Sequence, residues 1–279
     1  MGVSESSIKR WADVGALKVV RTIGGHRRIP LTEAVQFVRD SRAVLAQPAI
    51  LGLRNLPVAT RGRRGGVADG EQLADCLIAG EAAEVRGFVV GLYLGGSSVA
   101  AIVDGPLRTA MQRVGELWHH DPEGIFLEHR ATDICIQALN QLRVLMAPGE
   151  DARVALGGAP TGDPYLLPSL AVATTLDAEG YRAINLGPET TVAALARAIG
   201  RERPAIVWVS VSTDLAAEVL ARELDGLARA ARASEAHLIV GGRAIETASI
   251  TLPPDVQLAR SVGEAAAFAR GLAAGGGRA

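Results

Sequence analysis

Residues 152–273 alternate between short apolar runs and longer amphipathic stretches, and this alternation restricts the fold more than any other feature of the chain. The apolar runs, which we expect to form strands, are residues 153–156, 182–186, 205–211, 237–240 and the weaker 256–258. The stretches between them, which we expect to form helices, are residues 166–179, 191–202, 214–233 and 262–273. Strands that alternate with helices form a parallel sheet with helices on both faces. We therefore predict a doubly wound, flavodoxin-like α/β domain over residues 150–273.

A sheet of this kind binds ligands beyond the carboxyl ends of its strands. In this chain those ends carry residues 157–163, 210–213 and 241–242, which are rich in glycine, serine and threonine. Glycine lets a backbone approach a bulky ligand, and hydroxyl groups bond its polar atoms. Tight strand-to-helix turns need the same residues, so both interpretations stay open at this point.

The preceding region, residues 71–149, has a helical pattern throughout. The expected helices are residues 71–79, 81–94, 97–118 and 122–146. They are separated by Gly80, by Gly95-Gly96 and by Asp121-Pro122, where Asp is a favoured N-cap and Pro a favoured first helical residue. The number of helices and the short connections predict a four-helix bundle.

One segment of this bundle, residues 118–129, concentrates groups that could hold a ligand. It contains Trp118, Glu128 and three of the five histidines of the chain. Asp133 follows His129 by four residues, on the same helical face, where it could orient the imidazole. On residue types alone, a buried tryptophan beside solvated histidines explains the segment equally well.

Charge is distributed unevenly along the chain. Residues 1–66 hold twelve Lys/Arg and four Asp/Glu, a net charge of +8, whereas the remainder holds 17 and 26, a net charge of −9. A basic first quarter on an acidic body indicates a polyanionic partner for the N-terminal region.

The N-terminal pattern is a helix followed by a basic hairpin. We expect a helix over residues 4–14 with Ser4 as N-cap, strands over 18–21 and 26–29, and a further helix capped by Thr32. Such a helix suits the major groove of DNA, and the hairpin tip suits the phosphates. A solvated basic surface is the alternative. The predicted DNA-binding residues are Ser6, Lys9, Arg10, Arg21, His26, Arg27 and Arg28.

The runs Val3–Trp11 and Arg21–Ile29 resemble the recognition helix and wing of MerR-type winged helix-turn-helix regulators. The resemblance implies a DNA-binding domain over residues 1–45. In that family another helix precedes the recognition helix, and we expect it to be missing from this chain. Residues 46–70, with two prolines and a cluster of arginines and glycines, are predicted as a linker.

A four-helix bundle followed by a doubly wound domain resembles the cobalamin-binding module. With a MerR-type head, the chain resembles the light-responsive, adenosylcobalamin-dependent repressors of the CarH and LitR type. The sharpest motif is a Trp, nine residues and Glu-His, matched by Trp118 and Glu128-His129. The resemblance implies that Trp118 packs over the upper corrin face, that Glu128 bonds the nucleoside and that His129 shares the pocket. His119 would take the metal after light breaks the cobalt–carbon bond.

The lower half of the module departs from the family. The family motif Asp/Glu-x-His-x-x-Gly, whose His ligates cobalt from below, aligns with Asp163-Pro164-Tyr165-Leu166-Leu167-Pro168. A tyrosine thus replaces the ligand, and a proline replaces the glycine. Ser210-Val211-Ser212 replaces a Ser-x-Leu pattern, and the later Gly-Gly is present. The implied lower contacts are Asp163, Tyr165, Ser210, Ser212, Gly241 and Gly242, with Tyr165 also a weak metal-ligand candidate.

Several ligands are compatible with this substitution. A phenol must lose a proton before it ligates a metal, and phenolate suits ferric haem. Cobalamin with its own base or water below is the first prediction, and haem or a linear bilin in the same cleft is the second. A cofactor-free antirepressor is a further alternative. A corrinoid carrier for methyltransferases is another, since the chain has no room for a catalytic barrel and we expect no enzyme activity.

We therefore predict a multidomain α and α/β protein that regulates transcription, with a tetrapyrrole controlling its DNA affinity or oligomeric state. The tetrapyrrole would be held between the bundle and the α/β domain. Its expected partners are a double-stranded DNA operator, the tetrapyrrole and further copies of itself, as a dimer or tetramer. No apolar run is long enough for a bilayer, and the two isolated cysteines have neither zinc nor redox spacing. These features predict a cytoplasmic protein with no membrane partner.

Overall fold

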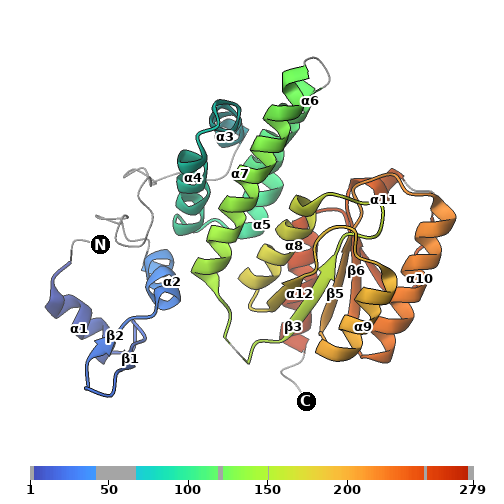
Figure 1. Ribbon diagram of the computed structural model, residues 1–279. Coiled ribbons are helices and arrows are strands. Elements are labelled where there is room, and N and C mark those ends of the chain that lie inside the picture. The colour runs from blue at the N-terminus through green and yellow to red at the C-terminus, as the bar shows by residue number, and fades with distance from the viewer. Residues whose placement is uncertain (1–2, 42–66, 119–121, 150, 248–249, 276–279) are drawn as a thin grey trace. The chain divides into compact units, whose positions relative to one another are not determined.

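The computed structural model describes residues 3–41, 67–118, 122–149, 151–247 and 250–275. The chain divides into two compact units, residues 1–147 (unit 1) and residues 148–279 (unit 2), shown together in Figure 1.

Unit 1 begins with a helix, a hairpin and a second helix. These are α1 (Glu5–Asp13), β1 (Val20–Arg21), β2 (Arg27–Arg28) and α2 (Leu31–Ser41). The Ser4 hydroxyl accepts the N–H of Ser7 at 3.2 Å, which confirms the predicted N-cap. The rings of Trp11 and Phe37 lie 4.9 Å apart and join α1 to α2. Thr32 lies inside α2, so its prediction as a cap is wrong.

The rest of unit 1 is helical. Its elements are α3 (Val67–Ala79), α4 (Ala82–Leu94), α5 (Val99–Ile102), the π-helical η2 (Val103–Leu107), α6 (Arg108–Trp118) and α7 (Pro122–Met146). Their apolar faces meet in a core that includes Leu73, Leu77, Leu92, Leu139 and Leu142, all fully buried. The bundle therefore rests on aliphatic burial, at roughly 25 cal/mol for each Å² of apolar surface.

Two boundaries differ from the sequence prediction. The helix expected over residues 97–118 is interrupted at η2, where Gly105 has φ −98° and ψ −105° and Pro106 lacks the N–H that a continuous helix needs. Helix α3 begins at Val67, so residues 67–70 of the expected linker are helical. The earlier part of that linker lies outside the described residues, as does Asp121, the expected cap of α7.

Helix α2 is attached to the C-terminal end of α4 through one arginine. The guanidinium of Arg39 lies 3.7 Å from the ring centroid of Tyr93, and it donates to the carbonyl oxygens of Tyr93 and, at 3.2 Å, Ser97. A cation is favoured at this position because the C-terminal end of a helix carries partial negative charge. Burial lowers the pKa of Arg39 and raises that of Tyr93.

Unit 2 contains a five-stranded parallel sheet in the order β4-β3-β5-β6-β7. The strands are β3 (Val154–Gly158), β4 (Arg182–Asn185), β5 (Ile206–Ser210), β6 (His237–Gly241) and β7 (Val256–Ala259). The helices are α8 (Leu166–Ala178), α9 (Val192–Glu202), α10 (Ala217–Ala233), α11 (Arg243–Thr247) and α12 (Val262–Gly275). This order confirms the predicted doubly wound, flavodoxin-like sheet; only the short α11 was not predicted.

Side chains alternate between the two faces of this sheet, as the pleat requires. Leu156, Val207 and Val209 pack with residues of α9 and α10 on one face. Ala155 and Trp208 pack with residues of α8 and α12 on the other. Figure 1 shows these two helical layers.

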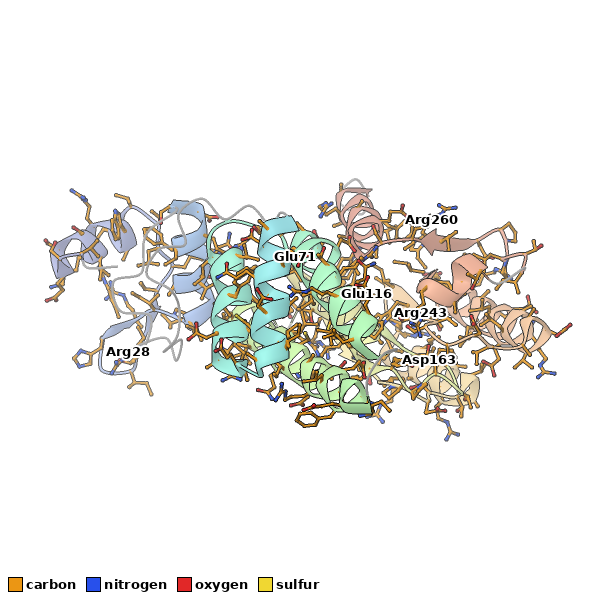
Figure 2. The ribbon with its side chains drawn as sticks, turned by 90° about the horizontal axis from the view of Figure 1, so that it is seen from above. Arg28, Glu71, Glu116, Asp163, Arg243 and Arg260 are labelled. Carbon is orange, nitrogen blue, oxygen red and sulfur yellow. The ribbon has the colours of Figure 1, made fainter. Side chains whose placement is uncertain are left out.

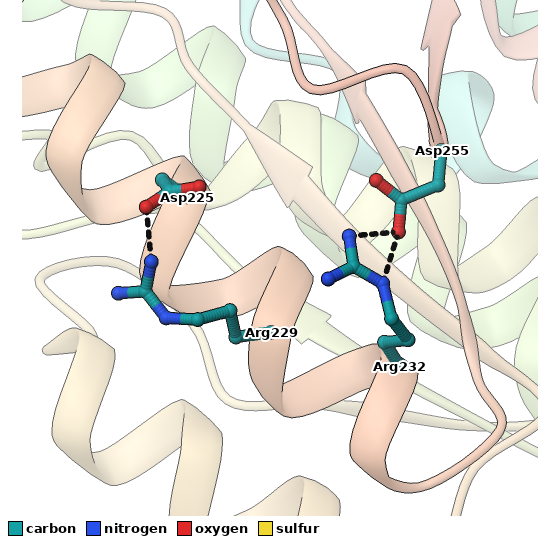
Figure 3. A network of polar contacts seen from close by, with 4 residues as sticks. All are labelled: Asp225, Arg229, Arg232 and Asp255. Carbon is teal, nitrogen blue, oxygen red and sulfur yellow. Dashed lines mark hydrogen bonds and ion pairs between the residues drawn. The ribbon is translucent and has the colours of Figure 1, made fainter.

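Two arginines of α10 form ion pairs with aspartates (Figure 3). Arg232 donates from Nε and Nη2 to one oxygen of Asp255, at 3.0 and 2.7 Å, and ties α10 to the residues before β7. This hydrogen bonding lowers the pKa of Asp255. One helical turn earlier Arg229 pairs with Asp225.

No helix among the described residues is long and apolar enough to cross a membrane.

Candidate cofactor site

Asp163 joins two loops at the carboxyl edge of the unit 2 sheet. Its side chain is fully buried in the loop between β3 and α8. The carboxylate accepts the backbone N–H groups of Tyr165 at 3.1 Å, Thr213 at 3.3 Å and Ser212. Because β4 and β5 flank β3 on opposite sides, this is the point where the chain changes direction across the sheet. Asp163 therefore fixes the two loops that border the usual ligand position of this fold.

A third loop reaches the same place from β6. The Nε–H of Arg243 donates to the carbonyl oxygen of Ser212 at 2.6 Å, and the guanidinium carbon lies 5.5 Å from the ring centroid of Tyr165. Figure 2 labels Asp163 and Arg243 in unit 2. The peptide groups of Ser212 are thus bonded on the N–H side by Asp163 and on the C=O side by Arg243. The structure brings three of the predicted contacts, Asp163, Tyr165 and Ser212, together at this edge.

Close packing inside unit 2 explains why residues 241 and 242 are both glycine. Gly242 has φ +110°, and a Cβ atom there would lie 2.2 Å from the carbonyl oxygen of Val211. A Cβ atom on Gly241 would lie 2.4 Å from the carbonyl oxygen of Ala259. These contacts favour the interpretation that tight packing of neighbouring loops requires both glycines. The adjacent Ser210 is 4% exposed and pairs with Gly241 in the sheet.

Trp208 fills the space beside β3 and was not singled out from the sequence. A Cβ atom on Gly157 would lie 2.3 Å from its indole, which is 1% exposed. The indole N–H donates to the Ser169 hydroxyl at 3.1 Å, and that hydroxyl donates to Asn185 at 2.8 Å. The only available signal was a bulky aromatic within an aliphatic strand.

Among the described residues of unit 2, no histidine lies at the carboxyl edge of the sheet, so this edge supplies no imidazole ligand for cobalt. His237 stands at the opposite, amino end of β6, with its ring 5.7 Å from that of Phe268. The described residues contain no group of three His, Cys, Asp or Glu side chains that could hold a metal ion. Tyr165 has a guanidinium as its neighbour, and a second cation is disfavoured there. The edge therefore fits contacts to the periphery of a cofactor, and does not fit ligation of its metal.

The predicted contacts in unit 1 lie near the start of α7. The side chain of Glu128 is 26% exposed and that of His129 is 77% exposed, with 3.5 Å between Oε2 and Nε2. Thr132 donates to Glu128 at 3.0 Å. Asp133 accepts from Gln137 at 2.8 Å, so the expectation that it orients His129 is not supported. The side chain of Trp118 and all of His119 and His120 lie outside the described residues.

Apolar side chains are exposed near the same place. Leu117, Ile125 and Phe126 are 37%, 48% and 57% exposed. The guanidinium of Arg130 lies 4.9 Å from the Phe126 ring and donates to the carbonyl oxygen of Ile78 at 2.6 Å. Apolar side chains are thus exposed at the end of α6 and at the start of α7. Ile125 and Phe126 were not singled out from the sequence, although their adjacency on an otherwise amphipathic helix was a signal.

The predicted DNA-binding residues are all exposed on α1 and the hairpin. Two of them have acidic neighbours. Arg27 pairs with Asp13 at 2.7 Å and thereby ties the hairpin to α1. Lys9 pairs with Glu5 at 2.8 Å, which lowers the pKa of that carboxyl group.

Residues 70–143, which span α3 to α7, match the family model of the B12 binding domain. This match supports cobalamin as the cofactor, as the sequence predicted. No curated protein matches the chain.

Solved structures of corrinoid proteins are similar to this chain. The monomethylamine corrinoid protein of Methanosarcina barkeri has a TM-score of 0.52 and 18% identity, over 72% of this chain and 96% of that chain. A cobalamin-binding protein from Desulfitobacterium hafniense has a TM-score of 0.35 and 16% identity, over 72% and 97% of the two chains. The methanol:cobalamin methyltransferase complex of Methanosarcina barkeri has a TM-score of 0.37 and 14% identity, over 99% and 94%. Only the first is similar enough to indicate a shared fold.

Proposed function

We propose that this chain is a DNA-binding regulator that responds to cobalamin. One observation carries the proposal: the bundle that matches the B12 binding domain is packed, through Arg39 and Tyr93, against the helix that follows a basic hairpin. A ligand that changes the end of α4 would therefore act directly on the proposed DNA-binding segment.

In this proposal α1 enters the major groove and the hairpin contacts phosphates. Arg10 and Lys9 project from α1, and His26 and Arg28 lie on the hairpin, all of them exposed. Arg27 has a positioning role because its ion pair with Asp13 holds the hairpin against α1.

Binding of duplex DNA at several salt concentrations tests this part. Arg28→Ala should weaken binding across all sequences and lower the slope of log K against log salt by about 1, because one phosphate contact is lost. Arg201→Ala removes an exposed charge from α9, far from the hairpin in sequence, and serves as the control. An unchanged salt slope in Arg28→Ala would show that the hairpin does not contact DNA.

The cofactor is proposed to be adenosylcobalamin, with Glu128 and His129 among its contacts and with light as the signal that breaks the cobalt–carbon bond. Absorption spectra and gel filtration of the chain loaded with adenosylcobalamin, in the dark and after illumination, test this. The expected result is a spectral change accompanied by a change in oligomeric state and in DNA affinity. Identical DNA affinity in both states would remove cobalamin from the control of DNA binding.

A corrinoid carrier is the second candidate. It is favoured by the fold shared with the monomethylamine corrinoid protein, over 96% of that chain. A carrier function would give the basic N-terminal segment of this chain no role. A carrier should bind cobalamin with full occupancy and bind DNA no better than a neutral protein does. The salt titration described above therefore separates the two candidates.

A further inference from the structure

Arg243 is held in a defined orientation at the carboxyl edge of the sheet. Its Nε–H is bonded to the Ser212 carbonyl at 2.6 Å, and its guanidinium carbon lies 5.5 Å from the centroid of the Tyr165 ring. Two contacts at different atoms restrict the planar group far more than a surface arginine is usually restricted. Asp163 fixes both partners, since it bonds the N–H groups of Ser212 and Tyr165.

The outer side of the same guanidinium is available. Arg243 is exposed, and among the described side chains no carboxylate forms an ion pair with it. A guanidinium carries five N–H donors in a rigid fork, and only the Nε–H is used by Ser212. Its terminal nitrogens therefore present an oriented cationic fork beside the usual ligand position of a doubly wound sheet.

Such a fork binds phosphate or carboxylate oxygens in pairs. The side chains around the corrin ring of cobalamin are neutral amides, whereas its nucleotide loop contains one phosphodiester anion. We propose that Arg243 binds this phosphodiester and that Tyr165 positions the guanidinium by stacking beneath it. The inference rests on the proposed cobalamin binding and adds what the carboxyl edge of unit 2 recognises.

This assignment gives Tyr165 a role that does not involve cobalt. An aromatic ring stacks on a guanidinium and orients it, while an imidazole at the same position would present a metal ligand. The hydroxyl group is not needed for stacking. Tyr165→Phe should therefore bind as the wild type does, and Tyr165→Leu should resemble a loss of Arg243.

Titration of the full chain with cyanocobalamin and with dicyanocobinamide, which lacks the phosphodiester and the base, tests the proposal. The wild type should bind cyanocobalamin more tightly. Arg243→Gln should weaken cyanocobalamin binding about tenfold or more, the usual effect of losing a charge-assisted contact, and leave dicyanocobinamide binding unchanged. Arg243→Lys keeps the charge without the fork and should show an intermediate loss. Arg201→Gln removes an exposed charge from the last turn of α9, towards the opposite edge, and should change neither affinity.

The outcomes separate this inference from the proposed function. If Arg243→Gln weakens the binding of both corrinoids equally, or of neither, the guanidinium does not bind the phosphodiester. Cobalamin binding by the chain would be unaffected by that outcome. If Tyr165→Phe loses as much affinity as Tyr165→Leu, the stacking role is wrong. Haemin, whose anions are carboxylates, is the further probe. If the wild type binds haemin and neither corrinoid, both the inference and the cobalamin proposal fail.

Discussion

The carboxyl edge of unit 2 and the start of α7 in unit 1 were both predicted as cofactor contacts. The two regions differ in how far their side chains are buried and bonded within the chain. At the edge, Asp163 is fully buried and bonded to three N–H groups, and Gly242 lies against a neighbouring carbonyl group. At the start of α7, His129 is 77% exposed, and its described contact is to the adjacent Glu128. Asp163 and Gly242 are thus bonded or packed within unit 2, whereas the side chain of His129 is exposed.

This difference separates two reasons why a site residue is the type it is. A residue whose polar groups are all bonded within the chain prepares the site, and its replacement should reduce stability. For a predicted contact whose polar groups are exposed, such as His129, we expect replacement to reduce cofactor affinity and leave stability unchanged.

Gly242→Ala should cause the largest loss of stability. The residue has φ +110°, and the added methyl group would lie 2.2 Å from the Val211 carbonyl oxygen, so the backbone must move. We expect the free energy of unfolding of unit 2 to fall by about 3 kcal/mol or more, measured by urea denaturation. Gly180→Ala, with φ +85° and open space around the position, should cost about 1–2 kcal/mol. Equal losses would mean that close packing at the edge contributes nothing.

Asp163→Ala should rank second. It leaves the buried N–H groups of Ser212 and Thr213 without their acceptor, which costs about 2–3 kcal/mol in the free energy of unfolding. The nearby Asp214→Ala is the control, because that side chain is exposed and its loss should change stability by less than about 0.5 kcal/mol. If the two variants unfold at the same urea concentration, the hydrogen bonds of Asp163 do not contribute to stability.

His129→Ala should leave stability within about 0.5 kcal/mol of the wild type, because the side chain is exposed. We expect it to weaken cobalamin binding several-fold, measured by absorption titration. His237→Ala removes a histidine from the amino end of β6 and should leave cobalamin affinity unchanged. A destabilised His129→Ala chain with normal affinity would reverse the distinction drawn between the two regions.

The smallest effect concerns pH. Burial raises the pKa of Glu179 above its ordinary value of 4.5, although its ion pair with Arg270 opposes the shift. The folded chain therefore binds this proton more tightly than the unfolded chain, and stability falls as pH rises from 4.5 through the raised pKa. Glu179→Gln cannot titrate, so the stability of the wild type minus that of the variant should decrease across this window and then level off. A difference that rises with pH would contradict the assignment.

The sequence predicted unit 2 well because its central strands β3, β5 and β6 are short, mostly apolar runs separated by amphipathic stretches of helical length. It failed at α11, whose five residues are too few to show a period. In unit 1 the apolar period continued through residues 97–118 and concealed the break at Gly105, although Pro106 was a visible signal. Helical pattern alone cannot locate a kink whose geometry depends on the packing of neighbouring helices.

The site was predicted less completely than the fold. Asp163, Tyr165 and Ser212 were found by comparison with family motifs, but Arg243, which contacts both Tyr165 and Ser212, was not found. Which backbone groups meet at a sheet edge depends on strand order and register, and one sequence does not reveal either. Arg243 carried no motif at all, because an arginine after a glycine pair is ordinary on a protein surface.

The contact between Arg39 and the end of α4 has a consequence for how the chain can be divided. A shortened protein that began at α3 would uncover one face of the Tyr93 ring and leave the carbonyl oxygens of Tyr93 and Ser97 without their guanidinium donor. The bundle would then present one face of an aromatic ring to solvent. Such a fragment should self-associate more readily than the intact chain, so residues 31–41 belong to the bundle in any attempt to isolate it.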